Sequence, residues 1–328
     1  MVFLAGLIVL GLAAFRLSPW PAVLVLRHSF DSEAQHAMQA LEPLLPDGLQ
    51  EKRDIPYLAG DDDALLDVIL PPGPVPPGGW PVVVWVHGGA WVSGSKENVG
   101  NYLRLLAGRG VAMVNVDYTL APSARHPVPA RQVNAALAWL AAHAGDEGLD
   151  ARRVVLAGDS AGAQIAAQTA IAQLDPAYAA ALGLEPALPA GSLRGLVLFC
   201  GGYDPAALNL EGPFGGFLKT VFWAYFGTRD VLNAPDLPLF SIPANLPDDM
   251  PPLFISAGNA DPLGPQSVAL AETAAARGIE VDALFFPPDH QPPLAHEYQF
   301  SLETQAGQQA LERTHAFLER VFSPPAAP

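Results

Sequence analysis

The sequence RVVLAGDSAGAQIAA, residues 153–167, decides the fold. An apolar, β-branched run ends at Ala157, and an alanine-rich segment suited to a helix follows Gly162. Between them stands GDSAG, with Ser160 at its centre. A sharp turn from strand to helix pushes such a serine out of the sheet, and the flanking glycines let neighbouring backbones pass close. We interpret Ser160 as a nucleophile; the alternative is an ordinary turn in which Ser160 caps the helix.

Short apolar strands alternate with helical segments on both sides of this motif. Such alternation predicts the α/β class, a mostly parallel sheet with helices on both faces and with reactive groups at the carboxyl ends of the strands. The predicted strands are 65–70, 82–86, 111–118, 153–157, 195–200, 253–257 and 279–286. The predicted helices are 101–109, 129–143, 161–173, 266–277 and 308–322.

A second motif, HGGAW, begins at His87, directly after the strand 82–86. Hydrolysis of an ester passes through a tetrahedral oxyanion, which needs preorganised hydrogen-bond donors. Glycine amides can turn inward without a Cβ in the way, so we expect Gly88 and Gly89 to supply two donors and Ala161 a third. His87 itself fits a residue that holds the loop better than it fits a base.

An acid and a base complete the predicted site. Asp261 stands in the sequence DPL, just after a predicted strand, where a carboxylate can orient a histidine and stabilise its protonated ring. His290 and His296 both lie beyond the strand 279–286. Either histidine can be the base that reaches Ser160.

Together these motifs resemble those of the hormone-sensitive-lipase family of α/β-hydrolases. The resemblance rests on HGGAW, DYTLAP at residues 117–122, GDSAG and DPL, in the chain order serine, aspartate, histidine. It covers roughly residues 50–320. It implies an eight-stranded sheet, a helical cap over the site, and carboxylesterase activity without a cofactor, often on short acyl chains. The family's nucleophile, acid and oxyanion donors carry over to Ser160, Asp261, Gly88, Gly89 and Ala161.

The chain departs from the family pattern at several positions. Ala90 stands where a third glycine is common, and Asn134 where an aspartate is frequent. Pro265 and Gln266 replace the acids that often follow DPL. None of these changes touches the nucleophile, but together they leave the choice of substrate open.

The resemblance favours His296 over His290 as the base. His296 is followed shortly by Phe300, and an aromatic residue soon after the base also occurs in the HGF-like ending of the family. The distance from His296 to the closing pair Phe317-Leu318 is also typical of the family. Against this choice, His290 lies nearer the strand end, where shorter loops place the base.

Composition argues against several other classes of function. The chain has 17 Lys and Arg against 33 Asp and Glu, a formal charge of −16, so it lacks the basic surface of a nucleic-acid-binding protein. Its single cysteine, Cys200, cannot form an intramolecular disulfide, and we interpret it as a small buried hydrophobe. No HExxH or similar pairing is present, so the sequence predicts no metal site and no cofactor.

The N-terminal segment allows two interpretations. The apolar run Val2–Phe15 is shorter than the ~20 residues that a membrane-spanning helix needs. It has the length of a signal-peptide core, but Arg16 and Arg27 follow it and no basic side chain precedes it. Residues 1–27 therefore either associate the protein with a membrane or export it, or they pack on the domain as a helix. The second interpretation leaves the protein in the cytoplasm.

We divide the chain into an apolar segment 1–30, a single hydrolase domain 31–322 and a flexible tail 323–328. Residues 31–50 have the spacing of an amphipathic helix, and the stretch 203–250 interrupts the alternation of strands and helices. Both stretches are predicted to form the cap.

The leading functional prediction is a serine carboxylesterase that cleaves a small ester through an acyl-enzyme and prefers short to medium acyl chains. An amidase, a lactonase or an acyltransferase can use the same triad. A ligand-binding protein on a hydrolase scaffold belongs to a different class and predicts a broken triad. The sequence names neither the ester nor the oligomeric state.

Overall fold

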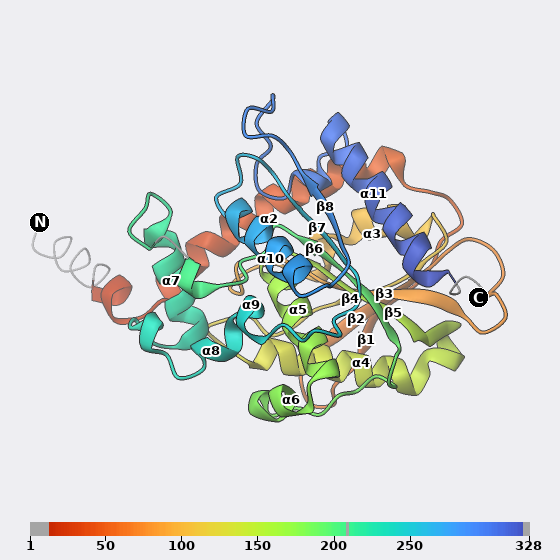
Figure 1. The fold of residues 1–328 in the computed structure, drawn as a ribbon, viewed down its shortest axis with the longest axis horizontal. Coiled ribbons are helices and arrows are strands. Elements are labelled where there is room, and N and C mark those ends of the chain that lie inside the picture. Colours follow the sequence, from red (N-terminus) through yellow and green to blue (C-terminus); the bar gives the residue numbers. More distant parts are fainter. Residues whose placement is uncertain (1–12, 208–209, 324–328) are drawn as a thin grey trace, which may run out of the picture.

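The computed structural model describes residues 13–207 and 210–323 and is built around one eight-stranded sheet (Figure 1). The strands are β1 (Gln50–Pro56), β2 (Leu65–Leu70), β3 (Trp80–Val86), β4 (Ala112–Val116), β5 (Leu149–Asp159), β6 (Leu193–Phe199), β7 (Leu253–Ala257) and β8 (Val281–Phe285). Their spatial order is β1-β2-β4-β3-β5-β6-β7-β8. β2 pairs antiparallel with β1 and with β4, and the remaining neighbours are parallel. The predicted mostly parallel sheet of eight strands is confirmed.

Helices cover both faces of this sheet. They are α2 (Trp20–Leu41), α3 (Gly100–Ala107), α4 (Val128–Glu147), α5 (Ser160–Leu174), α6 (Pro176–Leu182), α7 (Gly215–Phe226), α8 (Leu237–Phe240), α9 (Ile242–Asn245), α10 (Gly264–Ala276) and α11 (Gln305–Phe322). Short 3-10 turns are η1 (Glu42–Leu44), η2 (Lys96–Asn98), η3 (Pro205–Ala207), η4 (Val231–Asn233) and η5 (Tyr298–Phe300). Figure 1 shows α3 and α11 on one side of the sheet and α4, α5 and α6 on the other.

Alternate residues of β3 point to opposite faces of the sheet and belong to two separate cores. Val82, Val84 and Val86 pack in the core that includes residues of α4, α5 and α10. Val83 and Trp85 pack in the core that includes residues of α3 and α11. All five side chains are fully buried. Burial on both faces explains why this strand is an unbroken apolar run in the sequence.

Strand β1 has no counterpart among the predicted strands. Its sequence is QEKRDIP, and most of its residues are exposed because it lies at the edge of the sheet and, among the described residues, pairs with β2 alone. A continuous apolar run marks a strand that is buried on both faces, and an edge strand does not need one. A polar edge strand therefore gives no such signal.

Helix α2 begins earlier and ends earlier than the helix predicted over 31–50. It starts at Trp20, and its last regular turn ends at Leu41, where Pro43 in η1 stops it. Val23 is fully buried, and Arg27 donates hydrogen bonds to the carbonyl oxygens of two loop residues of the hydrolase domain. The first half of the helix is therefore attached to the domain.

Helices α2 and α7 contact each other and form the cap (Figure 1). Phe30 of α2 meets Phe217 of α7 edge to face, with ring centroids 6.0 Å apart. Across residues 13–207 and 210–323, no helix combines the length and apolar character required to span a bilayer. Most of the apolar run Val2–Phe15, and the tail from residue 324 onward, lie outside the described residues.

Candidate active site

Ser160 stands at the turn between β5 and α5. Its backbone φ is +50°, a left-handed conformation that is unusual for a residue other than glycine. The neighbouring chain passes close, and a Cβ on Gly162 would collide with the carbonyl oxygen of Val86. Asp159, not Ser160, occupies the N-cap position of α5, and its side chain does not cap the helix. This is a strained elbow that presents the serine, which differs from an ordinary capped turn.

The elbow presents Ser160 to a histidine and an aspartate. Ser160 Oγ lies 2.9 Å from His296 Nε2, and His296 Nδ1 lies 3.0 Å from Asp261 Oδ2. Asp261 is buried, while the His296 side chain keeps 33% of its exposure. The geometry fits the tautomer in which Nδ1 donates to the carboxylate and Nε2 accepts the serine proton. Burial opposes protonation of His296, but the neighbouring Cys200 and the hydrogen bond with Asp261 outweigh it and raise the pKa of the imidazole.

His290 meets a different set of neighbours. Its ring contacts Phe286, with centroids 4.7 Å apart, and its backbone carbonyl accepts a hydrogen bond from the Asn259 side chain. Of the two histidines in this loop, the structure brings His296 to Ser160.

The loop after β3 supplies amides to the site, but not all those that the sequence predicts. The Gly88 amide donates to Asp159 Oδ2 at 2.8 Å and is therefore occupied. Gly89 adopts φ +110°, and a Cβ there would collide with the carbonyl oxygen of Ser93. Within the described part of the chain, the amides of Gly89 and Ala90 have no hydrogen-bond acceptor.

These contacts change the expected set of oxyanion donors. Ala90 adopts φ +54° and follows Gly89 in the same turn. Ala161 lies in the first turn of α5, where amides have no partner within the helix. We therefore replace Gly88 with Ala90 and take Gly89, Ala90 and Ala161 as the candidate donors. Ala90 was not predicted as a donor because the left-handed φ that turns its amide is a property of the folded backbone and not of the residue type.

A pair of carboxyl groups lies beside the base and was not predicted. Asp159 accepts hydrogen bonds from Trp85 Nε1 and the Gly88 amide, both at 2.8 Å. Burial, reinforced by the neighbouring Glu297, raises the pKa of Asp159 to about 7. Glu297 adopts φ +60°, and its Oε1 lies 3.7 Å from His296 Nε2. Burial also raises the pKa of Glu297 above its usual range.

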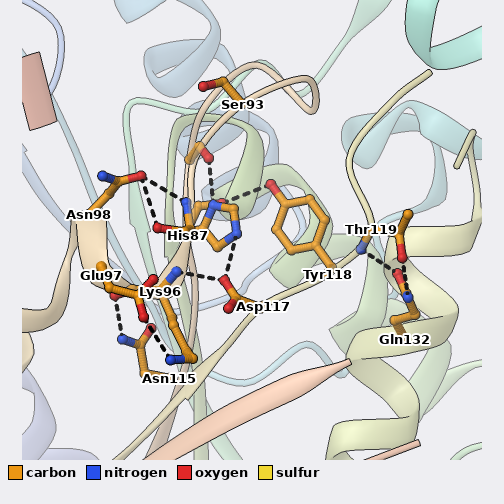
Figure 2. A network of polar contacts seen from close by, with 12 residues as sticks. His87, Ser93, Lys96, Glu97, Asn98, Asn115, Asp117, Tyr118, Thr119 and Gln132 are labelled. Carbon is orange, nitrogen blue, oxygen red and sulfur yellow. Dashed lines mark hydrogen bonds and ion pairs between the residues drawn. The ribbon is translucent and has the colours of Figure 1, made fainter. Parts of the chain in front are cut away.

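His87 stabilises the loop after β3, which carries Gly89 and Ala90 (Figure 2). Its ring is buried and stacks on Tyr118, with centroids 4.4 Å apart. Nδ1 donates to the Gly88 carbonyl at 2.7 Å, and the Tyr118 hydroxyl donates to the His87 carbonyl at 3.0 Å. Burial lowers the pKa of His87, which favours a neutral ring.

Lys96, at the end of this loop, bonds to several carboxylates (Figure 2). Its backbone amide donates to Asp117, and its buried ammonium lies 2.7 Å from Asp54, 3.1 Å from Asp67 and 2.8 Å from Glu97. Burial works against the charge, but these carboxylates compensate and raise the pKa of the amine. Such a network fixes the loop because breaking one partner leaves a buried charge uncompensated.

A cavity of about 440 Å³ opens over Ser160, between the sheet and the cap. This volume is in the range of small-molecule sites. Apolar side chains from α2, α7 and the loops line most of it, among them Phe30, Trp91, Phe214, Phe217, Phe222 and Leu263. Gly89, Ala90, Ala161 and His296 line the same cavity, so a bound ester would meet the nucleophile, the base and the donors together.

Comparison with known proteins finds an α/β-hydrolase family model and esterases among the similar sequences. A family model described as an alpha/beta hydrolase fold matches residues 83–290. Carboxylesterase NlhH of Mycobacterium tuberculosis (strain CDC 1551 / Oshkosh) is 32% identical over 285 residues, 85% of each chain. The acetyl esterase of Salmonella schwarzengrund (strain CVM19633) is 28% identical over 216 residues, 63% of each chain.

Solved structures share the fold. Esterase B from Lactobacillus rhamnosis (HN001) superposes with a TM-score of 0.76 at 22% identity, covering 92% of this chain and 96% of that one. The hyperthermophilic esterase from the archaeon Pyrobaculum calidifontis superposes with a TM-score of 0.71 at 23% identity, covering 91% and 93%. At these identities the likeness establishes the fold alone.

Proposed function

The chain belongs to the hormone-sensitive-lipase-like family of α/β-hydrolases, and from this premise we propose that it hydrolyses carboxylic esters through an acyl-enzyme on Ser160. The observation that carries the proposal is the continuous chain of contacts from Ser160 Oγ through His296 to Asp261, at 2.9 and 3.0 Å. Carboxylesterase NlhH, which matches 85% of this chain, supports the same reaction.

The first half-reaction forms the acyl-enzyme. His296 Nε2 takes the proton as Ser160 Oγ attacks the ester carbonyl, and Asp261 holds the ring and stabilises its positive charge. The amides of Gly89, Ala90 and Ala161 bind the oxygen on which negative charge develops. The intermediate collapses when Nε2 returns the proton to the departing alcohol.

The second half-reaction releases the acid. Water enters the place of the alcohol and attacks the acyl carbonyl, and His296 Nε2 takes its proton. The oxyanion binds the same three amides, and Ser160 leaves with the proton that His296 returns. The reaction needs no group beyond these side chains, amides and water.

Two alternatives are weaker on the same observations. An amidase, a lactonase or an acyltransferase shares the triad, but the curated relatives described above are esterases. Ligand binding without catalysis does not require a serine in a strained elbow at hydrogen-bond distance from a histidine.

We further propose a preference for short to medium acyl chains. The apolar cavity of about 440 Å³ has room for a small ester and is lined on one side by aromatic rings of α7. A Salmonella relative is an acetyl esterase, and a structural relative, esterase B, was solved with a C4-C4 tributyrin phosphonate inhibitor.

We also propose that the N-terminal region rests on a lipid surface. Large apolar side chains are exposed in one short stretch before and within the first half of α2: Phe15, Leu17, Trp20, Leu24 and Val25. Exposed apolar clusters of this kind mark interaction sites, and tryptophan favours the membrane interface. The run Val2–Phe15 that leads into the stretch is itself apolar.

A fluorophosphonate probe tests the proposed chemistry directly. Such a probe reacts with an activated serine, so we expect one covalent adduct on the wild-type protein, located at Ser160 by peptide mass spectrometry. Ser93 is a matched control, since it is a buried serine hydroxyl near the cavity without a histidine partner in the described structure. Absence of labelling on folded protein, or labelling at Ser93 instead, would refute the proposed nucleophile.

A further inference from the structure

Cys200 lies against the acid and the base of the triad. It follows β6 directly, its side chain is fully buried, and its backbone φ is +44°. The Cys200 sulfur, a carboxylate oxygen of Asp261 and an imidazole nitrogen of His296 all lie within 4.8 Å of one another. Across the residues that the structure describes, this is the one group of three metal-ligating side chains gathered so closely.

Sheet topology brings these three residues together. Strands β6, β7 and β8 are neighbours, and Cys200, Asp261 and His296 each follow the carboxyl end of one of them. Parallel strands end at the same edge of a sheet, so residues that are distant in sequence meet there. The sequence contains no metal-ligand spacing because the ligands come from three separate loops.

We propose that Cys200, Asp261 and His296 form an inhibitory binding site for a thiophilic divalent cation such as Zn²⁺. This inference rests on the proposed function, because inhibition presupposes that His296 is the base. Thiolate, imidazole and carboxylate are the ligands that Zn²⁺ takes, at about 2.0–2.3 Å each. Around a tetrahedral ion, ligand atoms at such distances lie about 3.3–3.8 Å apart, so the group closes with movements of about 1 Å.

The chemistry of the donors fits a buried cation. One thiolate and one carboxylate supply two negative charges against the two positive charges of the ion, and the imidazole is neutral. A balanced group of this kind avoids the cost of an uncompensated buried charge. His296 is one-third exposed and lines the cavity over Ser160, so the ion reaches the group from the cavity.

Binding of the ion removes the general base. The ion takes the lone pair of Nδ1, the nitrogen that faces Asp261, and the proton on Nδ1 moves to Nε2. The Cys200 thiol releases its proton to solvent, so one proton leaves the protein for each ion bound. Nε2 then carries a hydrogen and cannot accept the Ser160 proton across the 2.9 Å contact.

Inhibition by Zn²⁺ tests the role of the thiol. We expect Zn²⁺ to inhibit ester hydrolysis by the wild-type protein, with recovery on addition of EDTA. Cys200→Ala and Cys200→Ser, each measured against its own activity without metal, should raise the inhibitory Zn²⁺ concentration at least about tenfold, because even outer partners of metal ligands are worth 10–100-fold in affinity. The control is His315→Ala, which removes another potential zinc ligand on α11, beside Glu319, and should leave the inhibition unchanged.

Cobalt absorption tests the site without using activity. The Ser160→Ala protein titrated with Co²⁺ should show a thiolate-to-cobalt charge-transfer band, and the double variant with Cys200→Ser should not. If the Ser160→Ala protein shows the band but the wild-type protein has no esterase activity, the proposed function is refuted and the metal site stands. Equal Zn²⁺ inhibition of wild type and both Cys200 variants, or no thiolate band, would overturn the metal site.

Discussion

His296 and His290 lie in the same loop, and only one of them contacts Ser160. Removing a triad base usually lowers kcat by about four orders of magnitude or more. His296→Ala should therefore be nearly inactive on p-nitrophenyl butyrate, while His290→Ala should stay close to wild type. Both proteins should give wild-type far-UV circular dichroism. The reverse pattern in a steady-state assay would reassign the base and leave the nucleophile standing.

Gly89 allows a test of the revised oxyanion site. A Cβ at this position meets the Ser93 carbonyl in a left-handed turn, so Gly89→Ala should displace the amides of Gly89 and Ala90. Loss of one oxyanion donor typically costs about 10²–10³ in kcat. Gly145→Ala is the control, since a Cβ at Gly145 meets no atom within 4 Å. We expect a fall in kcat with little change in KM; an unchanged kcat for Gly89→Ala would contradict this assignment.

Asp159 should make stability depend on pH. Its pKa is about 7 in the folded chain and about 4 in an unfolded one, so between these values unfolding releases a proton. Its contribution to stability is complete below about pH 4 and is lost as the pH rises to about 7. Asp159→Asn removes this titration.

The effect of Asp159→Asn on the free energy of unfolding should therefore vary with pH. The difference between wild type and variant, measured by urea denaturation, should be largest near pH 4 and shrink toward pH 7. Comparing the two proteins cancels the titration of groups that the substitution leaves alone. A difference that grows with pH would show that Asp159 is ionised in the folded chain.

Motif order predicted that Ser160 and Asp261 meet at the site but left two histidines as candidate bases, and the family resemblance favoured His296. Ser160, Asp261 and His296 each follow a strand of the same sheet, and the strand pattern places them at one edge. The donor role of Ala90 and the carboxyl group of Glu297 depend on left-handed backbone angles, which no residue pattern records. Glu297 adopts a left-handed conformation that favours glycine, so the presence of a glutamate at this position does not predict such a turn.

At the level of single elements, the degree of burial decided which strands could be predicted from the sequence. Strands β3 and β7 are buried along almost their whole length and stand out as apolar runs, whereas the edge strand β1 is polar. The predicted bounds of helix α2 were wrong for a related reason. Its first half is rich in apolar residues and resembles the preceding run, so its true start at Trp20 is hidden.

Helix α2 sets the limits of a useful N-terminal deletion. Residues up to 27 include Arg27, which bonds the carbonyl oxygens of Val92 and Ala121, and Phe30 of the same helix lines the cavity. Removing residues 1–12 spares these contacts. Combined with Leu24→Ser and Val25→Ser, this deletion should abolish binding to phosphatidylcholine vesicles and keep activity on a soluble ester.

Vesicle co-sedimentation measures the effect. The control carries the deletion of residues 1–12 with Leu44→Ser and Val75→Ser, two exposed apolar side chains outside the N-terminal patch, and should bind vesicles as the simple deletion does. Wild-type protein that stays in the supernatant with vesicles at high lipid concentration would rule out the lipid-surface proposal.

At the scale of the whole molecule, the cavity under the cap should set acyl preference. We expect kcat/KM on p-nitrophenyl esters to peak at short or medium chains and to fall for long ones. Phe217 contacts Phe30 and Phe214 and lines the cavity, so Phe217→Ala should move the optimum to longer chains. Trp223→Ala alters the same helix away from the cavity lining and should not. A steady rise out to long-chain esters in wild type would contradict the proposal.

Most of the strand-and-helix alternation was predictable because a parallel sheet needs both faces covered, and this constraint repeats along the sequence. The cap carries no such repeat. Its helices α2 and α7 come from distant parts of the chain and are joined through contacts such as that of Phe30 with Phe217. Their size and packing set the cavity, which is why the class of reaction follows from the motifs and the acyl preference does not.

Removal of the Ser160 hydroxyl tests directly whether this side chain is the nucleophile. The measurement is kcat/KM of Ser160→Ala on p-nitrophenyl butyrate, beside wild type and beside Ser93→Ala as the matched serine control. We predict a loss of about four orders of magnitude or more for Ser160→Ala, with an unchanged thermal unfolding transition, and a near-normal rate for Ser93→Ala. Turnover by Ser160→Ala near the wild-type rate, in protein free of contaminating esterase, would show that Ser160 is not the nucleophile.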